Sequence, residues 1–178
     1  MAGLRERIGS GVLKQKLKTF TRETRVCNLK SAETALILFD AMDAESFPVV
    51  KSFMRTLEKD GISCQAYSYV NQKEIPQELL LQDHFQVLTR SDINWYHKPQ
   101  GEIAEQFYRL QADLLVDFNR HRPLVLQYLT RLSRARFKVG CYTEMKNDFD
   151  LMISLKEEDN AAFLSEQFLH YLGMLNPA

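Results

Sequence analysis

The segment 112–142 constrains the fold more than any other part of the chain. It reads ADLLVDFN, then RHRPLVLQYLTRLSRAR, then FKVGCY. The outer pieces are apolar runs of strand length, and the middle piece has the apolar spacing of an amphipathic helix opened by Pro123. Strand, helix and strand in this order form a βαβ unit, which joins two parallel strands. The segment therefore predicts a parallel sheet with a ligand crevice at the carboxyl ends of its strands.

The residues from Thr34 onward continue this alternation of strand and helix. The run ALILF is typical of a strand buried on both faces. A helix is expected from Ser46, with Pro48 in its first turn and Gly61 after its end. Further strands are expected in 62–70, 84–89 and 147–155, and further helices in 76–82, in 102–110 and from Glu157 onward.

Strands that alternate with helices at this spacing predict the α/β fold class. The expected architecture is a three-layer Rossmann-like sandwich with a mostly parallel sheet of about five to six strands, preceded by an N-terminal basic helix. A chain of 178 residues is long enough for one well-buried core and short for two. We therefore expect a single α/β domain over 30–178.

Residues 1–29 are expected to form a basic amphipathic helical arm. The first thirty residues hold eight lysines and arginines and two glutamates. With Ser10 as its N-cap, a helix would gather Leu13, Leu17 and Phe20 on one side. That apolar side would pack on the domain, pack on a second copy of the chain to give a homodimer, or lie on an anionic membrane surface.

The composition excludes several classes of protein. The chain holds 23 basic and 23 acidic residues, and this balance argues against a nucleic acid as the partner. No run approaches the ~20 apolar residues of a membrane span, and no secretory apolar segment opens the chain. The cysteines form no CxxC pair and are expected to be reduced structural thiols. We expect a cytoplasmic protein that is not an integral membrane protein.

Polar residues follow two of the expected strands. Asp40 and Asp43 come after the strand ALILF, and Asp117 and Asn119 end the strand of the βαβ unit. If the two strands are neighbours, the carboxylates converge, and they would hold Mg²⁺, act as an acid and a base, or cap helices and accept hydrogen bonds from loop amides. The chain contains no phosphate loop and no dinucleotide fingerprint, so we expect no cofactor and no resident metal.

Three basic residues open the helix that follows Asp117. Cations at a helix N-terminus oppose the helix dipole, and a bound anion would relieve that conflict. The trio therefore indicates an anionic small molecule as a ligand. The candidate ligand-binding residues are Asp40, Asp43, Asp117, Asn119, Arg120, His121 and Arg122. The cations at the other end of this helix, in 131–138, are expected to stabilise its dipole instead.

An irregular segment at 90–101 holds the one tryptophan of the chain. Its aromatic and basic side chains would stack on a ligand, enter a groove of a partner, or pack on their own domain. The candidate loop or partner contacts are Trp95, Tyr96, His97 and Lys98.

Several of these motifs resemble an uncharacterised family of small bacterial proteins, a domain of unknown function. The resemblance rests on TALILFDA after the basic arm, SDINWYHKP, ADLLVDFN, RLSRARFKVGCY and NDFDLMI, and it covers nearly the whole chain. It implies a bacterial cytoplasmic protein. The piece 113–141 is also similar to part of the N-terminal Rossmann-like domain of heptosyltransferase-type glycosyltransferases, a similarity that implies the fold alone.

These observations favour a non-catalytic binding or interaction module with a polar crevice at the strand carboxyl ends. One alternative is an enzyme that acts on an anionic small molecule, such as a phosphorylated or nucleotide-linked sugar. Another is a protein that binds the membrane surface through its N-terminal arm. The residue patterns select no catalytic residue, because no nucleophile motif accompanies the four histidines.

Overall fold

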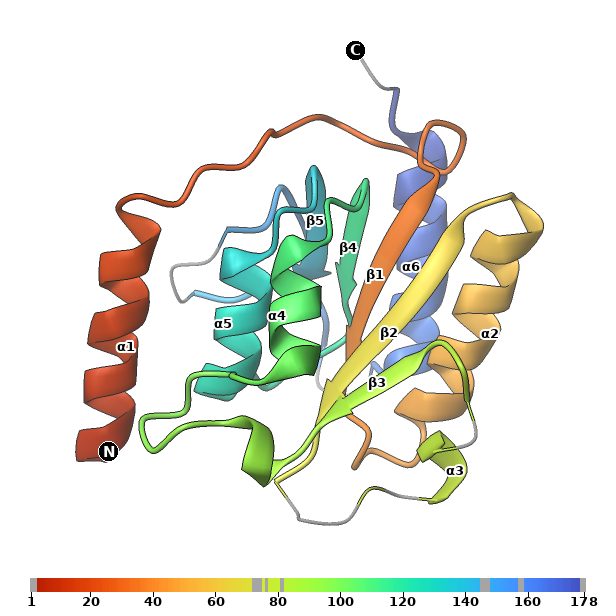
Figure 1. Cartoon of the computed structure of the whole chain (residues 1–178). Helices are drawn as coiled ribbons and strands as arrows, with labels where there is room; N and C mark the ends of the chain where they lie inside the picture. Colours follow the sequence, from red (N-terminus) through yellow and green to blue (C-terminus); the bar gives the residue numbers. More distant parts are fainter. Residues whose placement is uncertain are drawn as a thin grey trace.

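The computed structural model of the chain describes residues 3–71, 75, 77–80, 82–144, 148–156 and 159–176. Within them, all neighbouring strands of a six-stranded sheet run parallel (Figure 1). The strands are β1 (Thr34–Phe39), β2 (Ser63–Tyr69), β3 (Phe85–Leu88), β4 (Leu114–Asp117), β5 (Phe137–Cys141) and β6 (Leu151–Ile153). The expected α/β class and Rossmann-like architecture are confirmed.

Helices cover both faces of this sheet and complete three layers (Figure 1). One face carries α2 (Ser46–Lys59) and α6 (Ala161–Met174), and the other carries α4 (Glu102–Arg109) and α5 (Leu124–Leu132). The short helix α3 (Gln77–Leu80) and a 3₁₀ turn (Arg90–Asp92) lie before and after β3. Successive residues of β1 point to opposite faces of the sheet. Ile37 and Phe39 pack against α2 and α6, whereas Leu36 and Leu38 pack against α4 and α5.

The order of the strands, β3-β2-β1-β4-β5-β6, reverses direction between β1 and β4. From β1, the next two strands along the chain, β2 and β3, are added on one side. Helix α4 then connects β3 to β4, which lies on the other side of β1, and β5 and β6 follow beyond β4. Leu38 of β1 is paired with Asp117 of β4, so the chain leaves both strands at the same level. The connections after these two strands diverge, and open α/β sheets place their ligands in the crevice between them.

Helix α1 (Leu4–Leu17) packs against the outer side of α5. Gly9 lies in the middle of α1, where a Cβ atom would overlap the carbonyl oxygen of Tyr96 and the side chain of Leu124. Glycine permits this close approach. The Tyr128 hydroxyl donates a hydrogen bond of 2.7 Å to the Gly9 carbonyl oxygen. The expectation that the helix starts beyond this glycine is therefore wrong.

The remainder of the arm is not helical. Residues 20–28 run without helix or strand from the end of α1 towards β1 (Figure 1). Phe20 therefore lies outside the helix, contrary to the sequence prediction. Leu13 is buried against Leu124 and Tyr128 of α5, and Leu17 packs beside them. The apolar side of α1 thus packs on the domain, which is one of the three positions that the sequence left open.

The last helix, α6, begins at Ala161 and is capped by Asn160, whose side chain accepts a hydrogen bond from the Phe163 amide at 3.0 Å. The sequence predicts this helix from Glu157 onward, and residues 157 and 158 lie outside the described residues. Leu164, Phe168 and Leu172 form its buried face. Among the helices described, none combines the length and apolar character needed to span a bilayer.

Candidate functional site

A crevice lies at the reversal point of the sheet, between the connections that follow β1 and β4. Its volume is about 380 Å³, within the range of small-molecule sites. The wall is built from α1, the ends of β1 and β2, the loop after the 3₁₀ turn and the start of α5. The lining residues are Glu6, Asp40, Met42, Tyr69, Asn71, His97, Pro123, Leu124 and Val125.

Asp40 brings a carboxylate to the crevice directly after β1. Its side chain is exposed, and Oδ1 accepts a hydrogen bond of 2.8 Å from the amide of Met42, which fixes the turn. On the next strand, the Tyr69 hydroxyl donates to the side-chain oxygen of Asn71 at 3.2 Å. Across the crevice, α5 begins after Pro123, whose side chain cannot cap its first turn. The site therefore combines acceptor side chains with a helix start that has no capping hydrogen bond from its N-cap side chain.

His97 reaches the crevice from a strained turn. With φ of 67°, it is the one non-glycine residue of the described chain in the left-handed region. The side-chain oxygen of Asn94 holds the turn, because it accepts hydrogen bonds from the amides of Tyr96 at 3.2 Å and Lys98 at 2.9 Å. Strain of this kind persists where surrounding contacts fix it, and such positions cluster at ligand sites.

The four aromatic and basic residues of this loop have different surroundings. Trp95 is 59% exposed and meets the ring of Tyr96 edge-on. The Tyr96 carbonyl faces Gly9 of α1, so this part of the loop is a packing contact. His97 lines the crevice, whereas Lys98 lines a different pocket between α1, α4 and α5. The structure thus separates side chains that the sequence treated as one group.

Asp117 and Arg122 form a buried pair beside the crevice. Oδ2 of Asp117 lies 3.5 Å from Nε of Arg122, and the carboxylate also accepts hydrogen bonds from the Asn119 amide at 2.9 Å, the Asn119 side chain at 2.7 Å and the Thr130 hydroxyl at 3.0 Å. Burial raises the pKa of Asp117, and the charge of Arg122 opposes that rise. The carboxylate therefore ties β4 to α5.

Arg122 has further contacts within the protein. One of its terminal nitrogens donates a hydrogen bond of 2.9 Å to the carbonyl oxygen of Cys141, and its guanidinium lies 4.1 Å from the ring centre of Phe149. Its Nε and the side-chain oxygen of Asn119 are buried without a hydrogen-bond partner in the described part of the chain. Arg120 and His121 are exposed before the start of α5. Of the basic trio, Arg122 is thus held away from the crevice by the buried carboxylate.

Asp43 faces α2 and not the crevice. Its two oxygens accept hydrogen bonds from the Glu45 amide at 3.0 Å and the Ser46 hydroxyl at 2.8 Å. These contacts hold the turn that leads into α2, and the start of this helix is the position that holds the pyrophosphate in dinucleotide-binding folds. Carboxylates at this helix start oppose a bound phosphate, so the usual dinucleotide mode does not fit. Metal-binding clusters of three or more histidine, cysteine, aspartate or glutamate side chains are absent from the described residues.

The crevice brings together Asp40 and His97 from the predicted set, with Glu6, Tyr69 and Asn71 added. The sequence did not indicate Glu6, because α1 was expected to start after this residue. Tyr69 is the last residue of β2 and Asn71 follows that strand, but no sequence motif indicated either residue. The sequence prediction required β1 and β4 to be neighbours, and the two strands are paired in the sheet.

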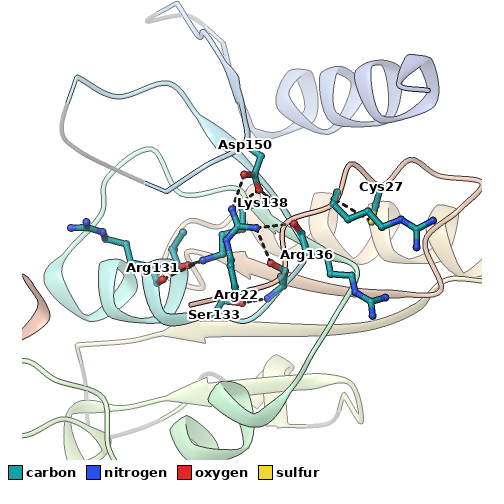
Figure 2. A network of polar contacts seen from close by, with 10 residues as sticks. Arg22, Cys27, Arg131, Ser133, Arg136, Lys138 and Asp150 are labelled. Atoms are coloured by element: carbon teal, nitrogen blue, oxygen red, sulfur yellow. Dashed lines mark hydrogen bonds and ion pairs between the residues drawn. The ribbon is translucent and has the colours of Figure 1, made fainter. Parts of the chain in front are cut away.

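A second polar network lies at the opposite, amino edge of the sheet (Figure 2). Arg22 donates to both oxygens of Asp150 at 2.6 and 2.8 Å and to the carbonyl oxygen of Arg136 at 2.7 Å. Arg131 pairs with Asp148 at 2.6 Å. Most of the basic run 131–138 is therefore engaged within the protein, at the helix end where it was expected.

Lys138 lies at the centre of this network and is completely buried. Its ammonium donates hydrogen bonds to the carbonyl oxygens of Thr130 at 2.8 Å and Arg131 at 3.2 Å, in the last turn of α5. Burial lowers the pKa of Lys138 to about 7. The lysine satisfies carbonyl groups that the helix itself leaves without donors.

The fold and the crevice define a Rossmann-like α/β protein with a candidate small-molecule site at the reversal point of its sheet. A model of the family of unknown function DUF6913 matches residues 5–175, so the chain belongs to that family. No curated protein is similar enough to the chain to count as a relative. The resemblance to a family of unknown function is thus confirmed, while the bacterial origin and the similarity to heptosyltransferase-type enzymes stay predictions.

Proposed function

We propose that this protein is a non-catalytic binding module that holds a small ligand in the crevice between β1 and β4. The observation that carries the proposal is the convergence of Glu6, Asp40 and His97 on a pocket of about 380 Å³ at the ligand position of the fold. These three side chains come from three separate elements, and the strained turn at His97 supports a functional role for the position.

The carboxylates of the wall favour a ligand that carries hydrogen-bond donors. Glu6 and Asp40 are acceptors when ionised, and the Asn71 side chain offers an amide beside them. Arg122, the cation expected to attract an anion, is paired with Asp117 instead. We therefore propose hydroxyl or ammonium groups as the recognised chemistry, as in a polyol, an amino sugar or a polyamine.

The hydrogen bonds and the exposure of the carboxylates at this edge of the sheet favour binding without turnover. Asp117 is the buried carboxylate at this edge, and its oxygens are engaged by Asn119, Thr130 and Arg122. Asp40 is exposed and held in a turn. Acid–base catalysis depends on buried groups with a shifted pKa that face the substrate. The buried carboxylate of Asp117 does not line the crevice, so it does not face a ligand there. The proposal includes a cytoplasmic location, which the three buried free cysteines support.

A thermal-shift screen tests the proposal. Polyols, amino sugars and polyamines are compared with phosphosugars and nucleotides, since a ligand at ~100 times its Kd adds ~2.7 kcal/mol of stability. We expect hits in the first group. Asp40→Asn and Glu6→Gln should weaken them about tenfold, and Asp60→Asn, which removes an exposed carboxylate outside the crevice, should leave them unchanged. Hits confined to phosphorylated compounds, or hits that survive both crevice variants, would contradict the proposal.

A further inference from the structure

A second pocket of about 420 Å³ lies under the carboxyl-terminal half of α1. It is bounded by α4, by the end of α5 and by the segment after His97. Its floor includes Phe20, Leu132 and the ring of Tyr108, and its cations are Lys16, Lys98 and Arg134. The pocket is distinct from the crevice, because the two share no lining residue.

The cations of this pocket, Lys16, Lys98 and Arg134, have no carboxylate partner among the residues that the structure describes. Glu105 also lines the pocket, but its carboxylate pairs with Arg109 at 3.4 Å on the outer face of α4. The pocket therefore carries an excess of positive charge.

In the neighbouring polar network, the arginines that pack within the protein are paired with carboxylates. Arg22 and Arg131 each meet an aspartate at 2.6 Å. Lys138 lies between them and lines the same hollow as Asp148 and Asp150. In the second pocket Lys16 and Arg134 are exposed and Lys98 is half-buried, and these cations from three separate segments gather around an apolar floor.

The floor offers a surface for an apolar body. Phe20 and Leu132 are half-buried, and Ala104 beside them is completely buried. The hydroxyl of Tyr108 is buried and has no hydrogen-bond partner in the part of the chain that the structure describes. Apolar walls with a few polar groups at the rim are typical of small-molecule sites.

We infer that this pocket binds a small organic anion with an apolar body. The acidic group lies between Lys16, Lys98 and Arg134, and the apolar body packs on Phe20 and Leu132. The chemistry is opposite to that of the crevice, so the inference stands independently of the proposed function.

Octanoate is a suitable probe, with octanamide as its neutral counterpart. Two-dimensional amide NMR spectra of the full chain are recorded as each probe is added. Octanoate should shift amides of three segments in one saturable process: 16–20, 98–108 and 132–134. This map on the unchanged protein tests the location without any variant. Shifts scattered over the basic surface, or shifts that do not saturate, would overturn the inference.

Charge variants test the recognition. The double variant Lys98→Gln/Arg134→Gln should weaken octanoate binding roughly tenfold and leave octanamide binding unchanged. The control Lys14→Gln/Lys59→Gln removes the same charge from exposed positions that do not line the pocket, and it should leave both affinities unchanged. Asp40→Asn should also have no effect, which separates this site from the crevice. An equal loss in the pocket and control variants would refute specific recognition of the anion.

Discussion

Lys138 should make the folded protein more stable as the pH rises from about 7 towards 10. Burial lowers the pKa of this lysine from 10.5 to about 7 in the folded state. The facing cations Arg22 and Arg131 lower the pKa further, and the carboxylates of Asp148 and Asp150 act against them. In this pH window the unfolded chain carries a proton on Lys138 that the folded chain has lost. Unfolding therefore takes up a proton, and raising the pH disfavours it.

The size of this effect follows from the change in the pKa of Lys138. One pH unit corresponds to ~1.4 kcal/mol for one proton, so the contribution of Lys138 to the free energy of unfolding should rise by ~2.5 kcal/mol from pH ~7.5 to ~9.5. The complete change is ~5 kcal/mol, an upper figure because buried polar groups relax. Below pH 7 both states carry the proton, and the dependence disappears.

The measurement is urea denaturation of the wild type and Lys138→Met at several pH values. Methionine keeps the length of the side chain and removes the titrating group. The hydrogen bonds lost to the carbonyls of Thr130 and Arg131 shift the difference by a constant. Burial raises the pKa of both Cys64 and Cys141 from 9.0 to about 12, so their contribution to the free energy of unfolding falls as the pH rises above 9.0. This fall is the same in the wild type and in Lys138→Met, so it cancels when the two free energies of unfolding are subtracted.

The difference in unfolding free energy, variant minus wild type, should therefore decrease by ~1.3 kcal/mol per pH unit between pH ~7.5 and ~9.5. Lys59→Met is the matched control, because Lys59 is exposed at the end of α2, and its difference should not change with pH. A Lys138→Met difference that is as flat as the control would show that the buried lysine stays protonated in the folded protein, and it would refute the reasoning.

Two further substitutions test the contacts around the sheet. Asp117→Asn should cost ~3 kcal/mol or more in urea denaturation, because it leaves the charge of Arg122 buried beside a neutral amide; a loss under ~1 kcal/mol would show that the pair is not a buried charge pair. Gly9→Ala should destabilise the protein by ~1–3 kcal/mol through overlap with Tyr96, whereas Gly11→Ala, with open space around its Cβ, should stabilise α1 by up to ~1 kcal/mol. Changes of the same sign in the two glycine variants would contradict the close packing of α1.

The strands and helices could be predicted because local patterns determine them. The run of apolar residues in β1 shows burial on both faces, and Gly61, with φ of 84°, ends α2 as its position suggested. The strand order needed contacts between distant residues. The pairing of Leu38 with Asp117 depends on α4 carrying the chain back across the sheet, and no local pattern encodes that return.

The candidate site shows the same division. Asp40 was found because its carboxylate follows a predicted strand. Arg122 was read as a cation for a ligand, since its partners are invisible in the sequence: Asp117 lies five residues before it, but the ring of Phe149 comes from a different part of the chain. Glu6 could be found only once α1 was seen to include Gly9, and the need for glycine there comes from the distant loop at Tyr96.

Helix α1 contributes a charged residue of opposite sign to each of the two pockets. Its first turn carries Glu6, which lines the crevice, and its last turn carries Lys16, which lines the second pocket. The lysines of its last turn complement the helix dipole, whereas the first turn carries Arg5 and Arg7 beside Glu6 and has no acidic excess. The side chains of Glu6 and Lys16 are ten residues apart, or ~15 Å along the axis. Ligands in the two proposed sites would therefore not compete for space, and we expect a substitution at either end of α1 to affect the nearer site alone.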